Sequence, residues 1–74
     1  MAEDTRYEHV KARLLAMGEG TAQQVFDAIE EPNPYSQREV ENVLDELAPN
    51  EPEEFEKVDG AYRWKKSYRF RMGV

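Results

Sequence analysis

The sequence predicts one α+β domain in which three helices precede a β-hairpin. Two observations carry this expectation. Three Ser/Thr-x-x-Glu/Gln segments have the pattern of a capping box, and each precedes apolar residues at helical spacing. An Asp-Gly pair then separates two short segments rich in strand-forming residues, as in a tight hairpin turn. A chain of 74 residues has room for a single domain, which we place over residues 1–74.

The three capping boxes set the expected starts of the helices at Thr5, Thr21 and Ser36. In this motif the hydroxyl accepts a hydrogen bond from the third amide along, and the acid or amide side chain at that position bonds back. Gly18 would end the first helix in the left-handed conformation, and prolines would stop the other two. The helices are therefore expected at about residues 5–17, 22–30 and 37–48, the last ending just before Pro49.

Each expected helix has one apolar stripe, whose residues recur three and four positions apart. A stripe of this kind buries itself against its neighbours, so these residues are the predicted helical part of the core. They are Tyr7, Val10, Leu14 and Met17 in the first helix, Ala22, Val25, Phe26 and Ile29 in the second, and Val40, Val43, Leu44 and Leu47 in the third.

The hairpin is expected at about residues 55–65, around a two-residue type I′ turn at Asp59-Gly60. Both central positions of this turn need a positive φ, which Asp and Gly tolerate. The resulting register places Phe55 opposite Trp64 and Glu56 opposite Arg63, an aromatic pair and a charge pair.

Aromatic and basic residues alternate after the turn. From Ala61 to Met72 there are five basic residues and no acidic one, and Lys66 alone breaks the alternation. Built as a strand, this segment has one aromatic and one cationic face. The aromatic face is interpreted as core, with a stacking platform for single-stranded nucleic acid or a protein-docking surface as alternatives. The basic aromatic tail, residues 66–74, outruns its hairpin partner, so it would either pair with a second copy in a homodimer or cover the first helix.

Charge divides the chain into two unequal parts. Residues 1–56 hold four basic and fifteen acidic residues, net −11, whereas residues 57–74 hold six basic and one acidic, net +5, giving −6 in all. The basic residues of the C-terminal part would either pair with acidic residues of the same protein or bind an anionic partner. The acidity itself fits an ordinary acidic surface or a halophile-like adaptation to a salt-rich cytoplasm.

Several classes of function are not expected. The chain has no cysteine and one histidine, His9, so it offers no transition-metal site of recognisable spacing. No nucleophile–base pattern, phosphate loop or dinucleotide fingerprint is present, so we expect neither an enzyme nor a cofactor. No apolar run approaches a membrane span and no signal-peptide pattern opens the chain, so a cytoplasmic protein without membrane contact is expected.

The order of helix, Gly-Glu-Gly link, helix, turn, helix and hairpin resembles the winged helix-turn-helix family, most of all its small archaeal and bacterial members. The match runs from Thr21 to Trp64 and covers the second helix (Thr-Ala-Gln-Gln-Val-Phe-Asp-Ala-Ile), the third (Ser-Gln-Arg-Glu-Val-Glu-Asn-Val-Leu-Asp-Glu-Leu) and the wing (Phe-Glu-Lys-Val-Asp-Gly-Ala-Tyr-Arg-Trp). The resemblance implies a third helix in the DNA major groove and a wing on the adjacent backbone or minor groove.

Duplex DNA binding, in a transcription regulator, is the function that this resemblance implies. The wing and tail would contact phosphates through Lys57, Arg63, Lys65, Lys66, Arg69 and Arg71, and the third helix would enter the groove with Gln37, Arg38 and Asn42. Four acidic residues on the exposed side of that helix, Glu39, Glu41, Asp45 and Glu46, oppose contact with phosphates. The alternative hypothesis is a protein-interaction module or homodimer without DNA binding, which uses the acidic third helix and the C-terminal strand.

Overall fold

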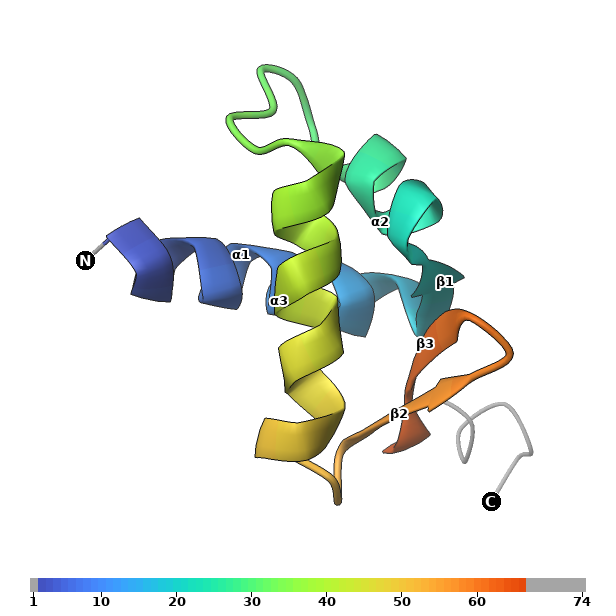
Figure 1. Ribbon diagram of the computed structural model, residues 1–74. Coiled ribbons are helices and arrows are strands. Elements are labelled where there is room, and N and C mark those ends of the chain that lie inside the picture. The colour runs from blue at the N-terminus through green and yellow to red at the C-terminus, as the bar shows by residue number, and fades with distance from the viewer. Residues whose placement is uncertain (1, 67–74) are drawn as a thin grey trace.

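The computed structural model describes residues 2–66, with side chains from Thr5 onward, and packs three helices against a three-stranded antiparallel sheet (Figure 1). The elements are α1 (Ala2–Met17), β1 (Glu19–Thr21), α2 (Ala22–Ala28), α3 (Gln37–Asn50), β2 (Phe55–Val58) and β3 (Ala61–Trp64). The strand order β1-β3-β2 sets the hairpin beside the short strand that links the first two helices. This is the predicted three-helix winged helix-turn-helix layout, in which residues 55–64 form the wing.

Two of the three predicted capping boxes are confirmed. Thr21 Oγ1 accepts from the Gln24 amide at 3.2 Å, and Gln24 Oε1 accepts from the Thr21 amide at 2.9 Å. Ser36 and Glu39 form the same pair of bonds at 3.1 and 2.8 Å. The box at Thr5 is wrong, because α1 already begins at Ala2 and Thr5 lies within the helix. The extra residues are an alanine followed by two acids, which suit a helix start by propensity and by the helix dipole.

The predicted ends of the second and third helices need correction. The second ends at Ala28 rather than at residue 30, because Ile29 turns into an extended conformation and its side chain enters the core. The third runs through Pro49 to Asn50. A proline has no amide to donate, but the Glu51 amide still reaches Leu47 O at 2.7 Å, so the last turn continues past it.

The hairpin has the predicted register, with Phe55 opposite Trp64 and Glu56 opposite Arg63. Asp59 and Gly60 have φ values of 51° and 80°, as a type I′ turn requires. The expected strand over residues 61–72 is wrong at Lys65 and Lys66, which are not in a strand, and its part over residues 67–72 lies outside the described residues. β2 begins only at Phe55 and therefore offers no ladder partner beyond Trp64.

One core joins all three helices to the sheet. Its buried members are Val10, Leu14, Val25, Ile29, Val40, Val43, Leu44, Leu47, Phe55 and Tyr62. The interpretation of the aromatic face of the wing as core is confirmed for Tyr62, since only 3% of this residue is exposed. Trp64 packs against the same core while partly exposed. The wing is therefore attached to the body through its aromatic face, which Lys57 shares as the cross-strand partner of Tyr62, whereas Arg63 lies on the opposite face.

Candidate nucleic-acid interface

The outer face of α3 carries the polar residues that were predicted from the sequence to enter the DNA groove. Its inner face is buried through Val40, Val43, Leu44 and Leu47, which leaves the opposite side to solvent. Gln37, Arg38 and Asn42 are all exposed in the first turns of the helix. Arg38, Asn42 and Asp45 follow one another at spacings of four and three, so they lie along one line of this face.

Arg38 differs from the other cations of residues 5–66. Within this described part of the chain, every other lysine and arginine has an acidic side chain or a carbonyl oxygen within reach. Arg38 has no such partner there and is exposed. With no acceptor among those residues, the Arg38 guanidinium can offer its donors to a ligand, and its planar shape suits recognition of a base edge or a phosphate.

The predicted wing cations contact acceptors of the protein itself. Arg63 lies 3.5 Å from carboxylate oxygens of both Glu19 and Glu56. Lys65 Nζ donates to a backbone carbonyl, Pro52 O, at 2.6 Å, and Lys66 Nζ lies 3.4 Å from a carboxylate oxygen of Glu54. Arg63 and Lys66 thus pair with acidic side chains, as expected if they balance the acidic body, whereas the partner of Lys65 is a backbone carbonyl. Arg69 and Arg71 lie outside the described residues.

Lys57, the remaining predicted wing cation, contacts α3. Its Nζ lies 3.3 Å from Asp45 Oδ1 and 5.1 Å from the centroid of the Tyr62 ring. The Tyr62 hydroxyl donates to the same Asp45 oxygen at 2.5 Å. These two donors, Tyr62 first, hold the pKa of Asp45 below its usual range, while burial and the Asp45 carboxylate raise the pKa of Tyr62. The pKa of Lys57 is raised by Tyr62 and Asp45.

These contacts change the charge of the α3 face. Glu39, which completes the capping box, also accepts from Arg6 Nη1 at 2.7 Å, and Asp45 is compensated by Lys57. The Ser36 amide, followed by Arg6, lowers the pKa of Glu39. Of the four acids on this helix that oppose phosphate contact, Glu41 and Glu46 are the two without a cationic partner among residues 5–66. The face is therefore less anionic than its residue count suggests.

Sequence reasoning missed the link between α3 and the wing. The available signal was Tyr62 itself, because a tyrosine buried in a core needs a hydrogen-bond partner for its hydroxyl. The predicted register also placed Tyr62 opposite Lys57. No periodicity identifies Asp45 as the acceptor, since that contact depends on how the hairpin packs against the helix.

Contacts from α1 and from the preceding loop fix the orientation of α3. Glu51 follows the last turn of α3 and accepts from Tyr7 Oη at 2.9 Å and Lys11 Nζ at 3.0 Å. Lys11 and then Tyr7 lower the pKa of Glu51, and Glu51 raises that of Lys11. Together with the Arg6–Glu39 pair at the other end, these bonds tie α3 to α1 along its length.

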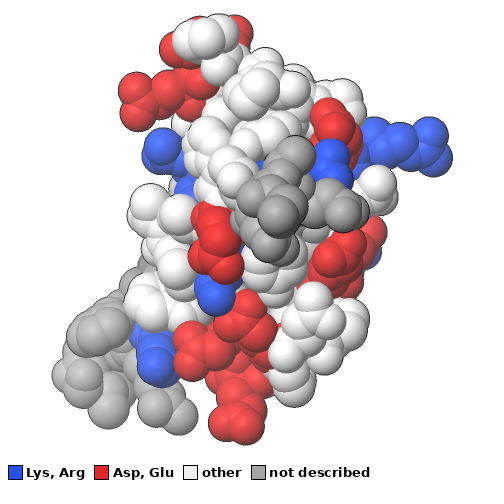
Figure 2. Space-filling model, turned by 90° about the vertical axis from the view of Figure 1, so that its left-hand side faces the viewer, with Lys and Arg blue, Asp and Glu red and all other residues white. Residues whose placement is uncertain are grey.

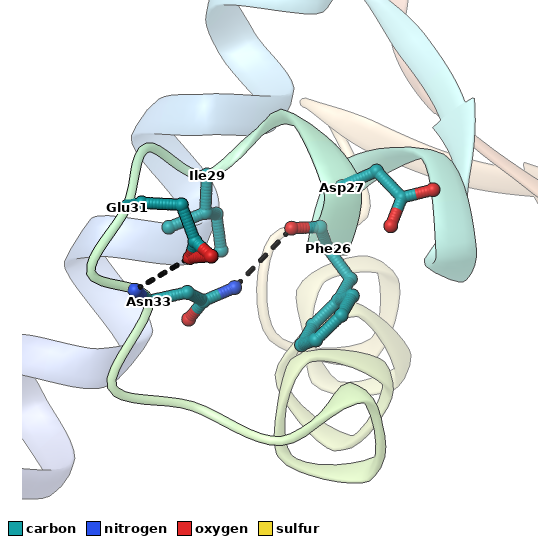
Figure 3. A pocket seen from close by; sticks show the side chains of 5 residues that line it. All are labelled: Phe26, Asp27, Ile29, Glu31 and Asn33. Atoms are coloured by element: carbon teal, nitrogen blue, oxygen red, sulfur yellow. Dashed lines mark hydrogen bonds between the residues drawn. The ribbon is translucent and has the colours of Figure 1, made fainter.

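The loop from α2 to α3 is braced by Asn33 (Figure 3). Its Nδ2 donates to Phe26 O at 3.2 Å, its Oδ1 accepts from the Tyr35 amide at 2.9 Å, and its own amide donates to Glu31 Oε2 at 3.1 Å. The loop encloses a small pocket lined by Phe26, Asp27, Ile29, Glu31 and Asn33. The acidic residues Asp27 and Glu31 in the lining of this pocket do not suit a phosphate. The hydrogen bonds of Asn33 instead fix the path of the loop that leads to Ser36, the N-cap of α3.

Acidic and basic side chains are mixed on the face that Figure 2 draws, which is not uniformly basic. Figure 2 shows one face, over which acidic side chains are widely spread and basic ones lie next to them at several places. Within the described residues, no three His, Cys, Asp or Glu side chains are grouped so that they could hold a metal ion. No helix in that same part of the chain is both long and apolar enough to cross a bilayer.

Comparison with protein-family models, with curated proteins and with solved structures gave no match to this chain.

Proposed function

We propose that this protein binds duplex DNA through the outer face of α3 and the wing, as a transcription regulator in the cytoplasm. The carrying observation is the exposed group of Gln37, Arg38 and Asn42 at the start of α3, in which Arg38 has no partner within residues 5–66. An α-helix fits the major groove. There an arginine can pair with guanine O6 and N7, and an asparagine or glutamine with adenine N6 and N7.

The charge of the α3 face is compatible with this proposal. Asp45 and Glu39 are compensated by Lys57 and Arg6, so the first turns of the helix present Arg38 beside one uncompensated acid, Glu41. A glutamate in the groove can itself accept from cytosine N4. The wing ion pairs are partly exposed, and solvent-screened pairs of this kind contribute little to stability, so exchanging a carboxylate for a phosphate costs little.

The test is fluorescence anisotropy with a labelled mixed-sequence duplex at about 50 and 200 mM salt, a range over which phosphate contacts weaken measurably. We expect wild type to bind and Arg38→Gln to lose at least about tenfold in affinity, the equivalent of one good base contact. Ala12→Glu is the matched control, since it makes the same one-unit change in net charge at an exposed position of α1. Absence of binding by wild type at the lower salt would refute the proposal, and an equal loss in both variants would remove Arg38 from the interface.

A second candidate is a protein-interaction module that docks a basic partner on α3. The observation in its favour is that the wing cations are paired internally while Glu41 and Glu46 are not. Replacing both glutamates with glutamine separates the two functions, because the change would strengthen DNA binding and weaken binding of a basic peptide.

The C-terminal tail could form a dimer in either case, and deletion of residues 66–74 followed by mass measurement in sedimentation equilibrium tests that arrangement.

A further inference from the structure

A single carboxylate oxygen connects the outer face of α3 to the wing. Asp45 Oδ1 accepts from the Tyr62 hydroxyl at 2.5 Å and from Lys57 Nζ at 3.3 Å. Lys57 and Tyr62 are cross-strand partners in the hairpin, and the ammonium group lies 5.1 Å from the centroid of the tyrosine ring. The three side chains thus form one cluster at the junction of helix and wing.

The two bonds to Asp45 differ in how firmly they are held. Tyr62 belongs to the core and is 3% exposed, so its ring cannot move without disturbing the packing. The side chains of Asp45 and Lys57 are 47% and 49% exposed. A lysine on a flexible stem at that exposure can leave its partner readily, whereas the tyrosine hydroxyl keeps the carboxylate in place.

The position of the cluster gives the lysine contact a consequence for binding. Asp45 lies on the same line of α3 as Arg38 and Asn42, the residues proposed to enter the groove. Lys57 is the wing cation joined to that face. A phosphate that approached Lys57 would therefore meet the Asp45 carboxylate as a rival for the same ammonium group.

We infer that Asp45 is a positioning residue that competes with DNA phosphate for Lys57. In the free protein Lys57 pairs with Asp45. In the complex the carboxylate, which Tyr62 holds in place, still competes, so that Lys57 transfers to a phosphate in only part of the complexes. Asp45 thereby limits both the affinity and the number of phosphates that the wing neutralises. This inference rests on the proposed function, since it names a regulator of the same interface.

The test compares DNA binding by wild type, Asp45→Asn, Lys57→Gln and the double variant. Asparagine keeps an oxygen for Tyr62 and removes the charge that holds Lys57. The control is Glu46→Gln, which makes the same charge change on α3 at an exposed residue without contact to Lys57. Thermal unfolding of each protein verifies that all are folded at the temperature of the assay.

We expect Asp45→Asn to bind more tightly than wild type and more tightly than Glu46→Gln. Without the carboxylate charge Lys57 can pair with a phosphate in every complex, which steepens the salt dependence by up to about 0.9 in slope, so the advantage of Asp45→Asn should shrink by up to about 3.5-fold between about 50 and 200 mM salt. In the Lys57→Gln background, Asp45→Asn should gain no more than Glu46→Gln does. In amide and side-chain spectra, the duplex should shift the Lys57 signals while the Tyr62 ring signals keep their positions.

Two results would overturn the inference while leaving DNA binding intact. One is an equal gain from Asp45→Asn and Glu46→Gln, which would mean that only net charge matters. The other is an undiminished gain from Asp45→Asn when Lys57 is absent. If no variant and no wild-type sample binds duplex DNA, the proposed function itself fails and the inference fails with it, and the two failures are therefore distinguishable.

Discussion

Removal of the Tyr62 hydroxyl is the most direct probe of the link between α3 and the wing. Tyr62→Phe leaves the buried ring in the core and deletes only the donor to Asp45. The substitution therefore separates the hydrogen bond from the packing. We expect the variant to fold with the same hairpin register and to be less stable than wild type.

The expected loss follows from the exposure of the acceptor. A hydrogen bond to a charged group contributes about 1.5–3 kcal/mol where solvent is excluded. The Asp45 side chain is 47% exposed, so solvent screens its charge. The bond should therefore contribute no more than the lowest values of that range. We expect a loss of about 1 kcal/mol, which lowers the melting temperature of a domain of this size by about 4–8 °C.

The pH dependence of this loss has a definite sign. The pKa of Asp45 is depressed in the folded state, so the bond stabilises the protein above the unfolded value of about 4 and is lost as pH falls through the folded value. The pKa of Tyr62 is raised, so its contribution is complete below about 10 and is lost as pH rises further. The difference between wild type and Tyr62→Phe should therefore be constant between about pH 5 and 9 and shrink at pH 3.

The assay is thermal unfolding followed by circular dichroism for wild type, Tyr62→Phe, Asp45→Ala and the double variant. Independent sites add to within about 0.3–0.5 kcal/mol, so a real bond must give a coupling energy above that range. A coupling energy near zero would refute the bond. A difference that persists unchanged at pH 3 would show that the hydroxyl acts through some group other than the Asp45 carboxylate.

Three further changes test other parts of the fold. Glu51→Gln should cost about 0.5–1 kcal/mol at pH 7 in urea unfolding, because the Lys11 ion pair is lost, and the gap should close as pH falls through the depressed pKa of Glu51. Leu44→Ala removes a fully buried side chain and should cost about 2–5 kcal/mol, a large share of the roughly 4–11 kcal/mol expected for a chain of this length, seen as a lower urea midpoint. Gly60→Ala should cost about 1–2 kcal/mol in the same assay through its positive φ alone, since an added Cβ there would meet no atom within 4 Å.

Local signals in the sequence predicted most of the fold. The capping boxes at Thr21 and Ser36 and the turn at Asp59-Gly60 are each complete within a few residues, so tertiary packing had little room to override them. The same capping pattern at Thr5 failed, because its residue types also fit a helix interior and the preceding residues extend the helix. A pattern of this kind therefore identifies a helix more securely than it identifies the first residue.

The strand β1 was not predicted, because its formation depends on tertiary contacts and not on its own residues. β1 consists of Glu19, Gly20 and Thr21, of which only Thr21 favours a strand by its residue type, and the segment is a strand because β3 pairs with it. In the candidate site, too, some features could be predicted from the sequence and others depend on tertiary packing. The exposure of Gln37, Arg38 and Asn42 followed from the helical phase, whereas the internal partners of the wing cations depend on loops and on hairpin packing.

Internal pairing changes how an acidic chain with this fold should be judged as a DNA binder. The formal charge of α3 counts Glu39 and Asp45 as repulsive, yet each faces a cation in the folded protein. Raising the salt concentration weakens both these ion pairs within the protein and the attraction between the wing cations and phosphates. Salt therefore does not strongly favour internal pairing over phosphate contact, or the reverse. Base contacts from Arg38 depend less on salt than phosphate contacts do, because they release no condensed counterions. The proposed interface should therefore derive its sequence preference from the start of α3 and only a modest, salt-sensitive part of its affinity from the wing.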